Sequence, residues 1–246
     1  MLLEICVTSV ESALAAQRGG AHRVELCENL SEGGTTPSYG MISVARKNLR
    51  IRLHVMIRPR GGDFLYNDNE FEIMRQDIAV AGELGADGVV FGILKTDGSI
   101  DTERTQELVR AAKPMHVTFH RAFDMTVDPL LSLEQVIDCG VDTLLTSGHA
   151  DKAPEGTDLL KKLVEQAGQR IEIMAGSGVT AENVSALATA TGAAAFHLTA
   201  KKNAASTMAY RKEKLFMGNG RQTEYEWIIA DESQVRQVKT ALDALQ

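Results

Sequence analysis

The chain has 246 residues, 44% of them hydrophobic, with a net charge of −7 and a pI near 5.4. No cluster of basic residues offsets this acidic balance, and no apolar run approaches the roughly 18 residues of a transmembrane helix, so neither a nucleic acid nor a membrane is expected as a partner. The three cysteines are too few for a disulfide framework and favour a reducing compartment, so we expect a soluble cytoplasmic protein.

Eight short runs rich in apolar and β-branched residues recur along the first part of the chain, about one βα unit of roughly 30 residues apart. Segments with helical start and stop signals lie between them. This alternation, in a chain close to the roughly 250 residues of such folds, predicts an α/β protein with a closed (β/α)8 TIM barrel. A doubly wound open sheet is the alternative. The predicted strands are residues 2–7, 23–27, 53–58, 88–94, 116–120, 143–147, 171–175 and 194–199.

The rest of the chain is expected to complete the same domain. We assign residues 1–246 to one TIM-barrel domain, with the barrel itself over about residues 1–200. An irregular polar segment is expected over 201–231. A final helix is predicted over 232–245, because Val235, Val238, Leu242 and Leu245 recur on one face.

In the first two predicted strands, apolar residues alternate with acids and thiols. The apolar set belongs against the helices, which places Glu4 and Cys6 of the first strand inside the barrel, together with Glu25 and Cys27 of the second. Interior charges cost several kcal/mol each unless they are paired. These residues are therefore expected near a water-accessible mouth, or in a paired network that serves a ligand.

The third and fifth strands and the turns after them add more polar residues. His197 of the eighth strand fits either the interior or the core. In the loop after the third strand, Arg60 and Asp63 lie on either side of a glycine pair that follows a proline. These two residues belong either to a ligand site or to a salt-bridged rim. The residues that the alternation adds to the interior or mouth are His54, Met56, Arg58, Thr118, His120, Arg121 and Asp124.

The loop after the seventh strand contains Gly176 and Gly178, followed by Thr180 as a helix cap. Glycines at this place expose backbone N–H groups, and TIM barrels often bind phosphate at the loops after strands seven and eight. The alternative is a tight turn that needs glycine for its backbone geometry alone. Ser147 adds a hydroxyl at the same end of the sixth strand.

Several phrases of the sequence together resemble the CutC copper-homeostasis family, in order from residue 2 to about residue 200. The resemblance implies a TIM barrel, cytoplasmic residence, a homo-oligomer and a role in copper handling. In some members, cysteines that match Cys6 and Cys27 are the proposed Cu(I) ligands. The phrases are LEIC from Leu3, RVELC from Arg23, EGGTTPS from Glu32, IRPRGGDF from Ile57, TFHRAFD from Thr118 and LTSG from Leu145.

Two functional hypotheses remain open at this point. The leading one is Cu(I) binding through Cys6 and Cys27, with Met56 as a further soft ligand, because Cu(I) prefers thiolates and thioethers. The alternative is a TIM-barrel enzyme that uses acid–base chemistry on a phosphorylated or carboxylated small molecule, since a copper buffer has no use for so many other charges. Its candidate catalytic residues are Glu4, Glu25, His120 and Asp124, and its candidate ligand-binding residues are Arg58, Arg60, Asp63, Arg121, Ser147, Gly176 and Gly178. A barrel without activity that serves as an interaction scaffold is a third, weaker hypothesis.

Overall fold

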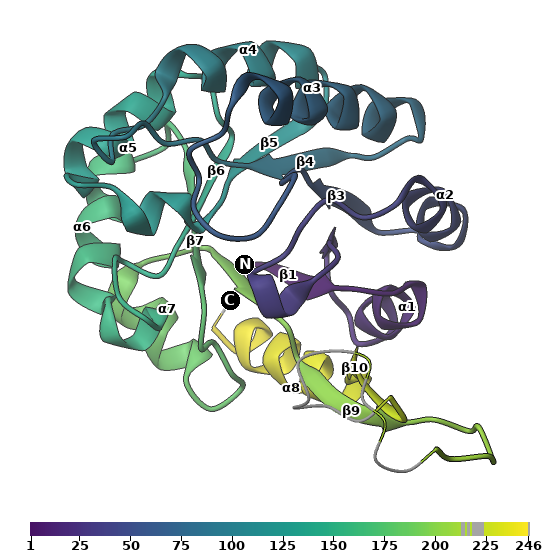
Figure 1. Ribbon diagram of the computed structural model, residues 1–246. Helices are drawn as coiled ribbons and strands as arrows, with labels where there is room; N and C mark the ends of the chain where they lie inside the picture. The colour runs from purple at the N-terminus through teal and green to yellow at the C-terminus, as the bar shows by residue number, and fades with distance from the viewer. Residues whose placement is uncertain (213–214, 216, 218–223, 246) are drawn as a thin grey trace.

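The structure, a computed structural model, describes residues 1–212, 215, 217 and 224–245. Eight parallel strands form a closed barrel in which each strand pairs with the next and β8 pairs with β1 (Figure 1). This confirms the predicted TIM-barrel class. The barrel strands are β1 (Leu2–Val7), β2 (Arg23–Leu26), β3 (Arg52–Met56), β4 (Gly88–Phe91), β5 (His116–Phe119), β6 (Thr143–Thr146), β7 (Glu172–Gly176) and β8 (Ala195–Leu198).

Helices follow the strands and form an outer layer around the barrel (Figure 1). Their starts are set by local capping: Asn67 and Glu70 form a reciprocal capping box at the start of α3, and Asp128 accepts hydrogen bonds from the first backbone N–H groups of α5. The helices are α1 (Val10–Arg18), α2 (Tyr39–Asn48), α3 (Asp68–Glu83), α4 (Thr102–Ala112), α5 (Pro129–Asp138), α6 (Thr157–Ala167), α7 (Val184–Thr191) and α8 (Glu232–Asp243).

The alternation of residues in the strands divides the core into two parts. Outward strand residues such as Leu3, Ile5 and Val24 join the helix faces in one continuous hydrophobic core. The inward residues do not belong to it. Cys6 and Cys27 instead form a separate small cluster inside the barrel. The structure therefore confirms the predicted alternation, with the apolar residues of the first two strands facing the helices and the acids and thiols facing the barrel interior.

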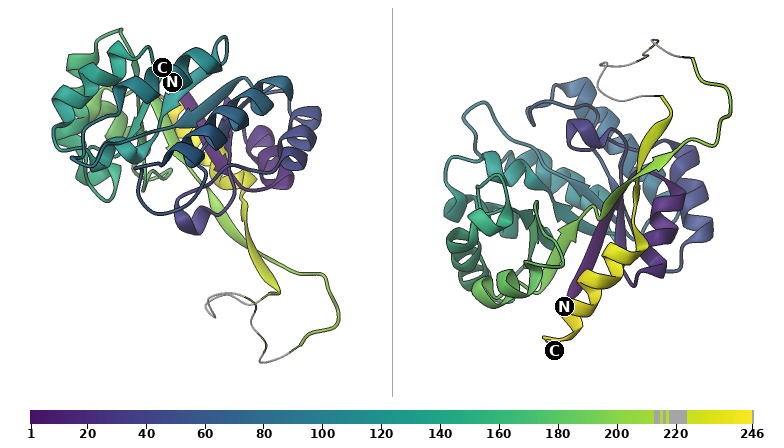
Figure 2. Two further views of the ribbon diagram at one scale, coloured as in Figure 1. Left: turned by 45° about the horizontal axis from the view of Figure 1, so that its top comes forward. Right: turned by 90° about the horizontal axis from the view of Figure 1, so that it is seen from below.

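The segment expected to be irregular contains two strands. β9 (Lys201–Ala205) pairs antiparallel with β10 (Glu226–Ala230), and the two form a ribbon separate from the barrel sheet. The prediction of an irregular segment was wrong here, because the polar sequence of β9 has no alternation and its strand conformation depends on a partner about twenty residues away. Figure 2 shows this ribbon extending away from the barrel body.

α8 returns the chain to the barrel. It buries Val235, Val238 and Leu242, as its periodicity predicted, and it contacts α1 and α7. The N-terminus and the end of α8 lie close together, at the end of the barrel opposite the ribbon (Figures 1 and 2). Among the described helices, none has the length and apolar character that crossing a membrane requires.

Candidate functional site

The two thiols predicted to face inward are neighbours in the structure. Cys6 lies in β1 and Cys27 directly follows β2, and both are buried. The strand register sets Cys6 beside Glu25, so Cys27 lies one pleat nearer the C-terminal mouth. The two Sγ atoms are nevertheless only 3.4 Å apart. Met56 belongs to the same buried cluster, and Leu30 of the loop after β2 packs over it. The result is a soft, apolar donor set.

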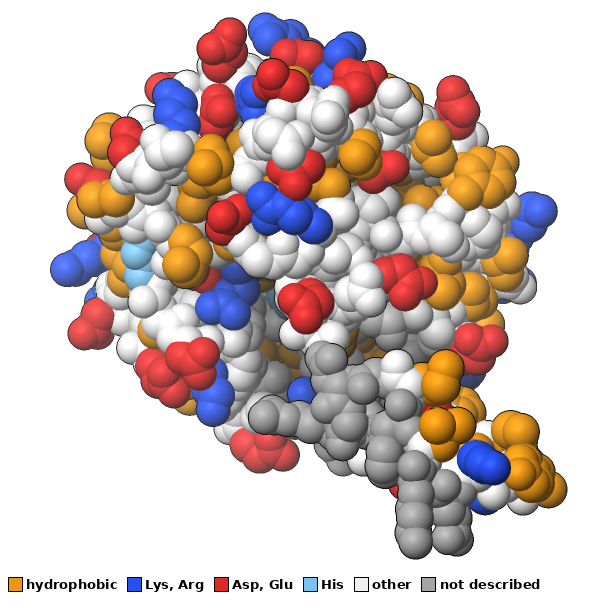
Figure 3. Space-filling model, in the orientation of Figure 1, with side chains coloured by type: hydrophobic (Ala, Val, Ile, Leu, Met, Phe, Trp, Pro, Cys, Tyr) orange, Lys and Arg blue, Asp and Glu red, His pale blue; other side chains and the backbone are white. Residues whose placement is uncertain are grey.

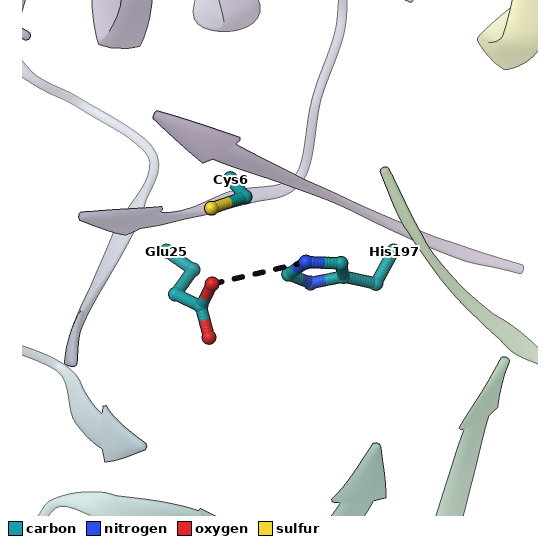
Figure 4. Close-up of side chains that lie close together, drawn as sticks. All are labelled: Cys6, Glu25 and His197. Atoms are coloured by element: carbon teal, nitrogen blue, oxygen red, sulfur yellow. Dashed lines mark ion pairs between the residues drawn. The ribbon is translucent and has the colours of Figure 1, made fainter. Parts of the chain in front are cut away.

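A carboxylate and an imidazole lie next to Cys6 (Figure 4). The donor atoms of Cys6, Glu25 and His197 all lie within 4.8 Å of one another, close enough for all three to bind one metal ion. His197 Nε2 is 3.7 Å from Glu25 Oε2, whereas Glu25 Oε1 is buried and has no hydrogen-bond partner among the described residues. Burial raises the pKa of Glu25, although the charge of His197 opposes the shift.

Beneath this group lies a fully buried ion pair. Arg23 Nε donates to Glu4 Oε2 at 2.5 Å, and His197 Nδ1 lies 2.7 Å from Glu4 Oε1. Burial by itself raises the pKa of Glu4, but Arg23 and the hydrogen bond from His197 together hold it well below its ordinary value. Glu4 is thus a fixed anion that orients His197, and not a free proton carrier.

His197 has a carboxylate on either side of its ring. Burial lowers its pKa, but the charges of Glu25 and Glu4 and the hydrogen bond to Glu4 outweigh burial and raise the pKa above its ordinary value. Neither Arg23 nor His197 was among the predicted site residues. Arg23 shares the inward parity of Glu25 and Cys27, so the alternation that found those residues also contained the signal for Arg23.

His120 presents a hydrogen-bond donor to the mouth. Its Nδ1 accepts from the backbone N–H of Ala122 at 3.2 Å, and its Nε2 has no partner among the described residues. Burial lowers the pKa of His120 to about 3, so the ring is neutral near pH 7. A neutral ring that accepts at Nδ1 carries its proton at Nε2. His120 therefore offers an N–H group and not a base.

Arg58 is buried, but most of its donors are already used. Its terminal nitrogens donate to the carbonyl oxygens of Glu32, Gly34 and Gly62 at 2.6 to 2.9 Å, and its guanidinium lies 4.9 Å from the ring centre of Phe64. Only Nε lacks a partner among the described residues. Arg58 thus ties the loops after β2 and β3 together over the mouth.

Two predicted ligand-binding residues lie outside the mouth. Arg60 pairs with Glu70 at 2.6 Å and with Asp63 at 2.9 Å, and its side chain is 38% exposed. Neither Arg60 nor Asp63 lines the cavities described below. They form the salt-bridged rim that was the alternative interpretation of this loop.

Asp124 holds the loops after β5 and β6 together. It accepts from the backbone and hydroxyl of Ser147, from the hydroxyl of Thr146 and from Arg121 Nε at 2.7 Å. With these donors in place, Asp124 acts as an anchor. Its effect on the mouth is to position Arg121, whose terminal nitrogen Nη2 donates to the Ser147 hydroxyl at 2.9 Å.

The two glycines of the loop after β7 have different roles. Gly176 is the last residue of β7, and a Cβ there would lie 2.5 Å from a methyl carbon of Leu145, so glycine is needed for packing inside the barrel. Gly178 has a φ of +69° and lines a cavity. Of the two, Gly178 is the one in position to contact a ligand.

Two cavities meet at the mouth. The inner one, about 120 Å³, is lined by the thiol and carboxylate of the site, by His120 and by apolar residues that include Met56 and Phe64. The outer one, about 610 Å³, lies between the loop after β7, the chain after β8 and α8. Arg121, His197 and Thr199 line both cavities. The charged side chains around the mouth are of both signs, without one large basic patch on this face (Figure 3).

A closed parallel barrel with acids, imidazoles and thiols gathered inside its C-terminal mouth defines a TIM-barrel protein whose candidate site lies at the usual end of the fold. The chain belongs to the CutC family, whose model matches residues 1–202. A CutC family protein from Chromobacterium violaceum is 52% identical over 242 residues, which cover 98% of each chain.

Two further relatives agree with this assignment. The copper homeostasis protein cutC homolog of Homo sapiens is 48% identical over 236 residues, covering 96% of this chain and 86% of that one. The crystal structure of CutC from Streptococcus agalactiae superposes with a TM-score of 0.78 at 42% identity, covering 81% of this chain and 98% of that chain. Both the fold and the copper-homeostasis family name are therefore supported by close relatives.

Proposed function

We propose that this protein acts in copper homeostasis in the cytoplasm by binding Cu(I) through Cys6 and Cys27. The observation that carries the proposal is the pair of buried thiols whose sulfur atoms lie 3.4 Å apart beside a cavity at the mouth. Thiolates are the preferred ligands of Cu(I). All three cysteines are free, as a metal-binding role in a reducing compartment requires.

The distance between the sulfurs favours a third ligand. If the metal–sulfur bond is about 2.3 Å, as it is for zinc, a linear site needs sulfurs roughly 4.6 Å apart and a trigonal site roughly 4.0 Å apart. The 3.4 Å separation is nearer to the trigonal value. Met56, a thioether in the same buried cluster as Cys6 and Cys27, is the soft donor best suited to the third position.

Metal binding also has to remove the thiol protons. The hydrogen bond with Cys27 and burial raise the pKa of Cys6 well above its ordinary value, so the thiol is protonated before metal binds. A carboxylate oxygen of Glu25 lies within 4.8 Å of the Cys6 sulfur, so Glu25 is the carboxylate in position to accept the thiol proton. Cu(I) binding is therefore coupled to proton release, and its affinity rises with pH.

A competition titration with a Cu(I) chelator tests the copper site. Wild-type protein is expected to bind one Cu(I) per chain, and the Cys6→Ser, Cys27→Ser double variant is expected to lose at least about 100-fold in affinity, because the soft ligands are gone. Cys139→Ser is the matched control, since Cys139 lies at the end of α5 with its thiol near the Thr102 carbonyl. A double variant with wild-type affinity would remove the assignment.

A second function, acid–base catalysis on a small molecule, is favoured by a different observation. Glu25 Oε1 and His120 Nε2 are both buried without a partner in the described part of the chain, and both residues line the inner cavity. Buried polar atoms are rarely left unsatisfied, and an unsatisfied pair that faces a cavity fits a ligand that supplies the missing partners. Glu25 would take a proton, and His120 would donate a hydrogen bond to a substrate oxygen.

A further inference from the structure

The outer cavity is larger than a copper site needs, and it lies beside the proposed copper ligands rather than around them. At about 610 Å³ it falls within the range of small-molecule pockets, whereas a metal ion bound by Cys6 needs only the inner cavity. It is lined by the loop after β7, by Lys201 of β9 and by Gln234 and Gln237 of α8. The cavity therefore belongs to a ligand larger than an ion.

The loop from Ser177 to Thr180 supplies free hydrogen-bond donors to this cavity. The backbone N–H groups of Gly178 and Val179 donate to no described residue, and both residues line the cavity. Ser177 and Gly178 have φ values of +73° and +69°, and the Ser177 carbonyl is held by the backbone N–H of Ala153. A fixed loop with unused N–H groups is suited to an oxyanion with several oxygens, such as a phosphate.

The charges at the cavity are of mixed sign. Lys201 and Arg121 contribute positive charge, and Arg121 is held in place by Asp124. Glu182 contributes negative charge at the rim, and its pKa is lowered chiefly by a hydrogen bond from the Thr180 side chain. An anion is thus attracted chiefly by Lys201, because the charge of Arg121 is paired with Asp124, and it is opposed by the exposed carboxylate of Glu182.

The outer and inner cavities adjoin and share part of their lining. Arg121, His197 and Thr199 line both, so a molecule seated on the loop after β7 can reach His120 at the inner end. His120 is only 4% exposed, and its Nε2–H group has no partner among the described residues. This donor requires an acceptor oxygen on the ligand.

We propose that the two cavities together bind a phosphorylated small molecule that carries a carbonyl oxygen. The phosphate lies on the N–H groups of Gly178 and Val179 near Lys201, and the carbonyl oxygen accepts from His120 Nε2. The phosphate half stands independently of the copper site. The carbonyl half rests on the second candidate function and names its substrate class.

Isothermal titration with inorganic phosphate tests the loop. Wild-type protein is expected to bind, Lys201→Gln to weaken binding about fivefold, and Glu182→Gln to tighten it about twofold, as expected for removal of one charge near an anion. Lys202→Gln is the matched control, because Lys202 is the next residue of β9, pairs with Asp231 at 3.3 Å and does not line the cavity. No phosphate binding, or equal losses in the Lys201 and Lys202 variants, overturns the phosphate half.

A panel of aldose and ketose phosphates, each compared with the same sugar without phosphate and with a carboxylate analogue, tests the carbonyl half. A compound that fits is expected to bind at least about tenfold more tightly than inorganic phosphate, which corresponds to roughly 1.4 kcal/mol. His120→Phe should abolish that gain without changing the affinity for inorganic phosphate, and His120→Gln, which keeps an N–H donor, should restore part of it.

Other outcomes separate this proposal from the copper proposal. Equal affinity for sugars with and without phosphate, or tighter binding of the carboxylates, contradicts a phosphate site. A gain that survives in His120→Phe contradicts the role of His120. The Cys6→Ser, Cys27→Ser variant should keep its phosphate affinity, so loss of copper binding and loss of phosphate binding are measured independently.

Discussion

Arg23 is the residue on which the charged interior of the barrel depends. It is 1% exposed, it bonds Glu4 at 2.5 Å, and it also lies 3.9 Å from Glu172. A buried ion pair is weak evidence for stability as a whole, but removal of one partner leaves a buried charge without compensation. Glu4 in turn fixes His197 at the mouth, so Arg23 links stability to the geometry of the site.

We predict that Arg23→Met destabilises the protein by about 3–5 kcal/mol, because the Glu4 carboxylate is left buried without its guanidinium. Urea denaturation at pH 7 measures the loss. A Glu4→Gln, Arg23→Met double variant removes both charges, keeps an acceptor for His197 and should recover part of the stability. If the single and double variants are equally unstable, the loss comes from packing and not from the unpaired charge.

The same ion pair predicts how stability depends on pH. The pKa of Glu4 in the folded protein lies below its ordinary value of 4.5, so the contribution of its charge is fully present above that value and is lost as the pH falls below it. In Arg23→Met the buried Glu4 carboxylate lacks its guanidinium and its folded-state pKa rises, so the stability penalty of the variant is relieved as the pH falls and Glu4 takes up a proton. Urea midpoints measured from pH 7 downward should therefore converge for the two proteins, and a constant difference down to pH 3 would contradict this account.

For the charged residues inside the barrel, the sequence predicted which way each side chain points but not which residue it contacts. Strand alternation placed Glu4, Cys6, Glu25 and Cys27 inside the barrel, and the structure has them there. It could not show that Glu4 is neutralised by a neighbour and oriented toward an imidazole, because that depends on the register between strands. The same limit applies to Arg58, whose partners are carbonyl oxygens of loops that no side-chain pattern marks.

At the scale of elements, β4 makes room for the imidazoles. A Cβ at Gly88 would lie 2.6 Å from His54 Nε2, and a Cβ at Gly92, just after β4, would lie 2.6 Å from His120 Nδ1. Each glycine therefore leaves the space that a ring on a neighbouring strand occupies. Glycine weakens a strand unless another group approaches closely, and here an imidazole does so.

We predict that Gly92→Ala displaces the His120 ring and costs about 1–3 kcal/mol of stability, the usual range for overpacking. Thermal denaturation measures the cost in stability. Titration with the sugar phosphate proposed to bind His120 should show the same loss of affinity as His120→Phe. Gly40→Ala is the control, because Gly40 lies in α2 where the nearest atom to a new Cβ is 4.0 Å away. Equal behaviour of the two variants would contradict the steric role of Gly92.

Element boundaries show why some of the fold could be predicted and some could not. The barrel strands have strong local signals, and each observed strand begins within one residue of its predicted start. β9 has none, since its residues become a strand only by pairing with β10. Sequence pattern thus predicts elements that bury an alternating face, and it fails where a strand is defined by a distant partner.

At the scale of the whole molecule, the site is made by closure of the barrel. β8 pairs with β1 and sets His197 beside Glu4 in register, although 193 positions separate them in the chain. The outer cavity likewise needs β9 and α8, which follow the barrel and close its side. The outer cavity is therefore incomplete in any fragment that lacks β9 and α8.

The ribbon of β9 and β10, together with the chain that follows β9 as far as Arg211, gives the molecule a projecting arm with exposed apolar side chains. Met208, Tyr210 and Trp227 are 55%, 67% and 50% exposed, and hydrophobic side chains gather on this arm in Figure 3. Exposed apolar groups that project from a compact body usually mark an interaction surface. Together with the family resemblance, they lead us to propose that the chain forms a homo-oligomer through the arm.

We therefore predict that light scattering coupled to size exclusion gives a mass that is a multiple of 26.7 kDa. Tyr210→Ser with Trp227→Ser should shift the mass toward the monomer, because the apolar area that drives association is removed. Val127→Ser is the control, since Val127 is 77% exposed but lies in the loop before α5, away from the arm. A monomeric wild-type protein would contradict the proposed homo-oligomer. A double variant that assembles like the wild type would instead assign the interface to another surface of the molecule. Neither outcome changes the proposals made for the barrel mouth.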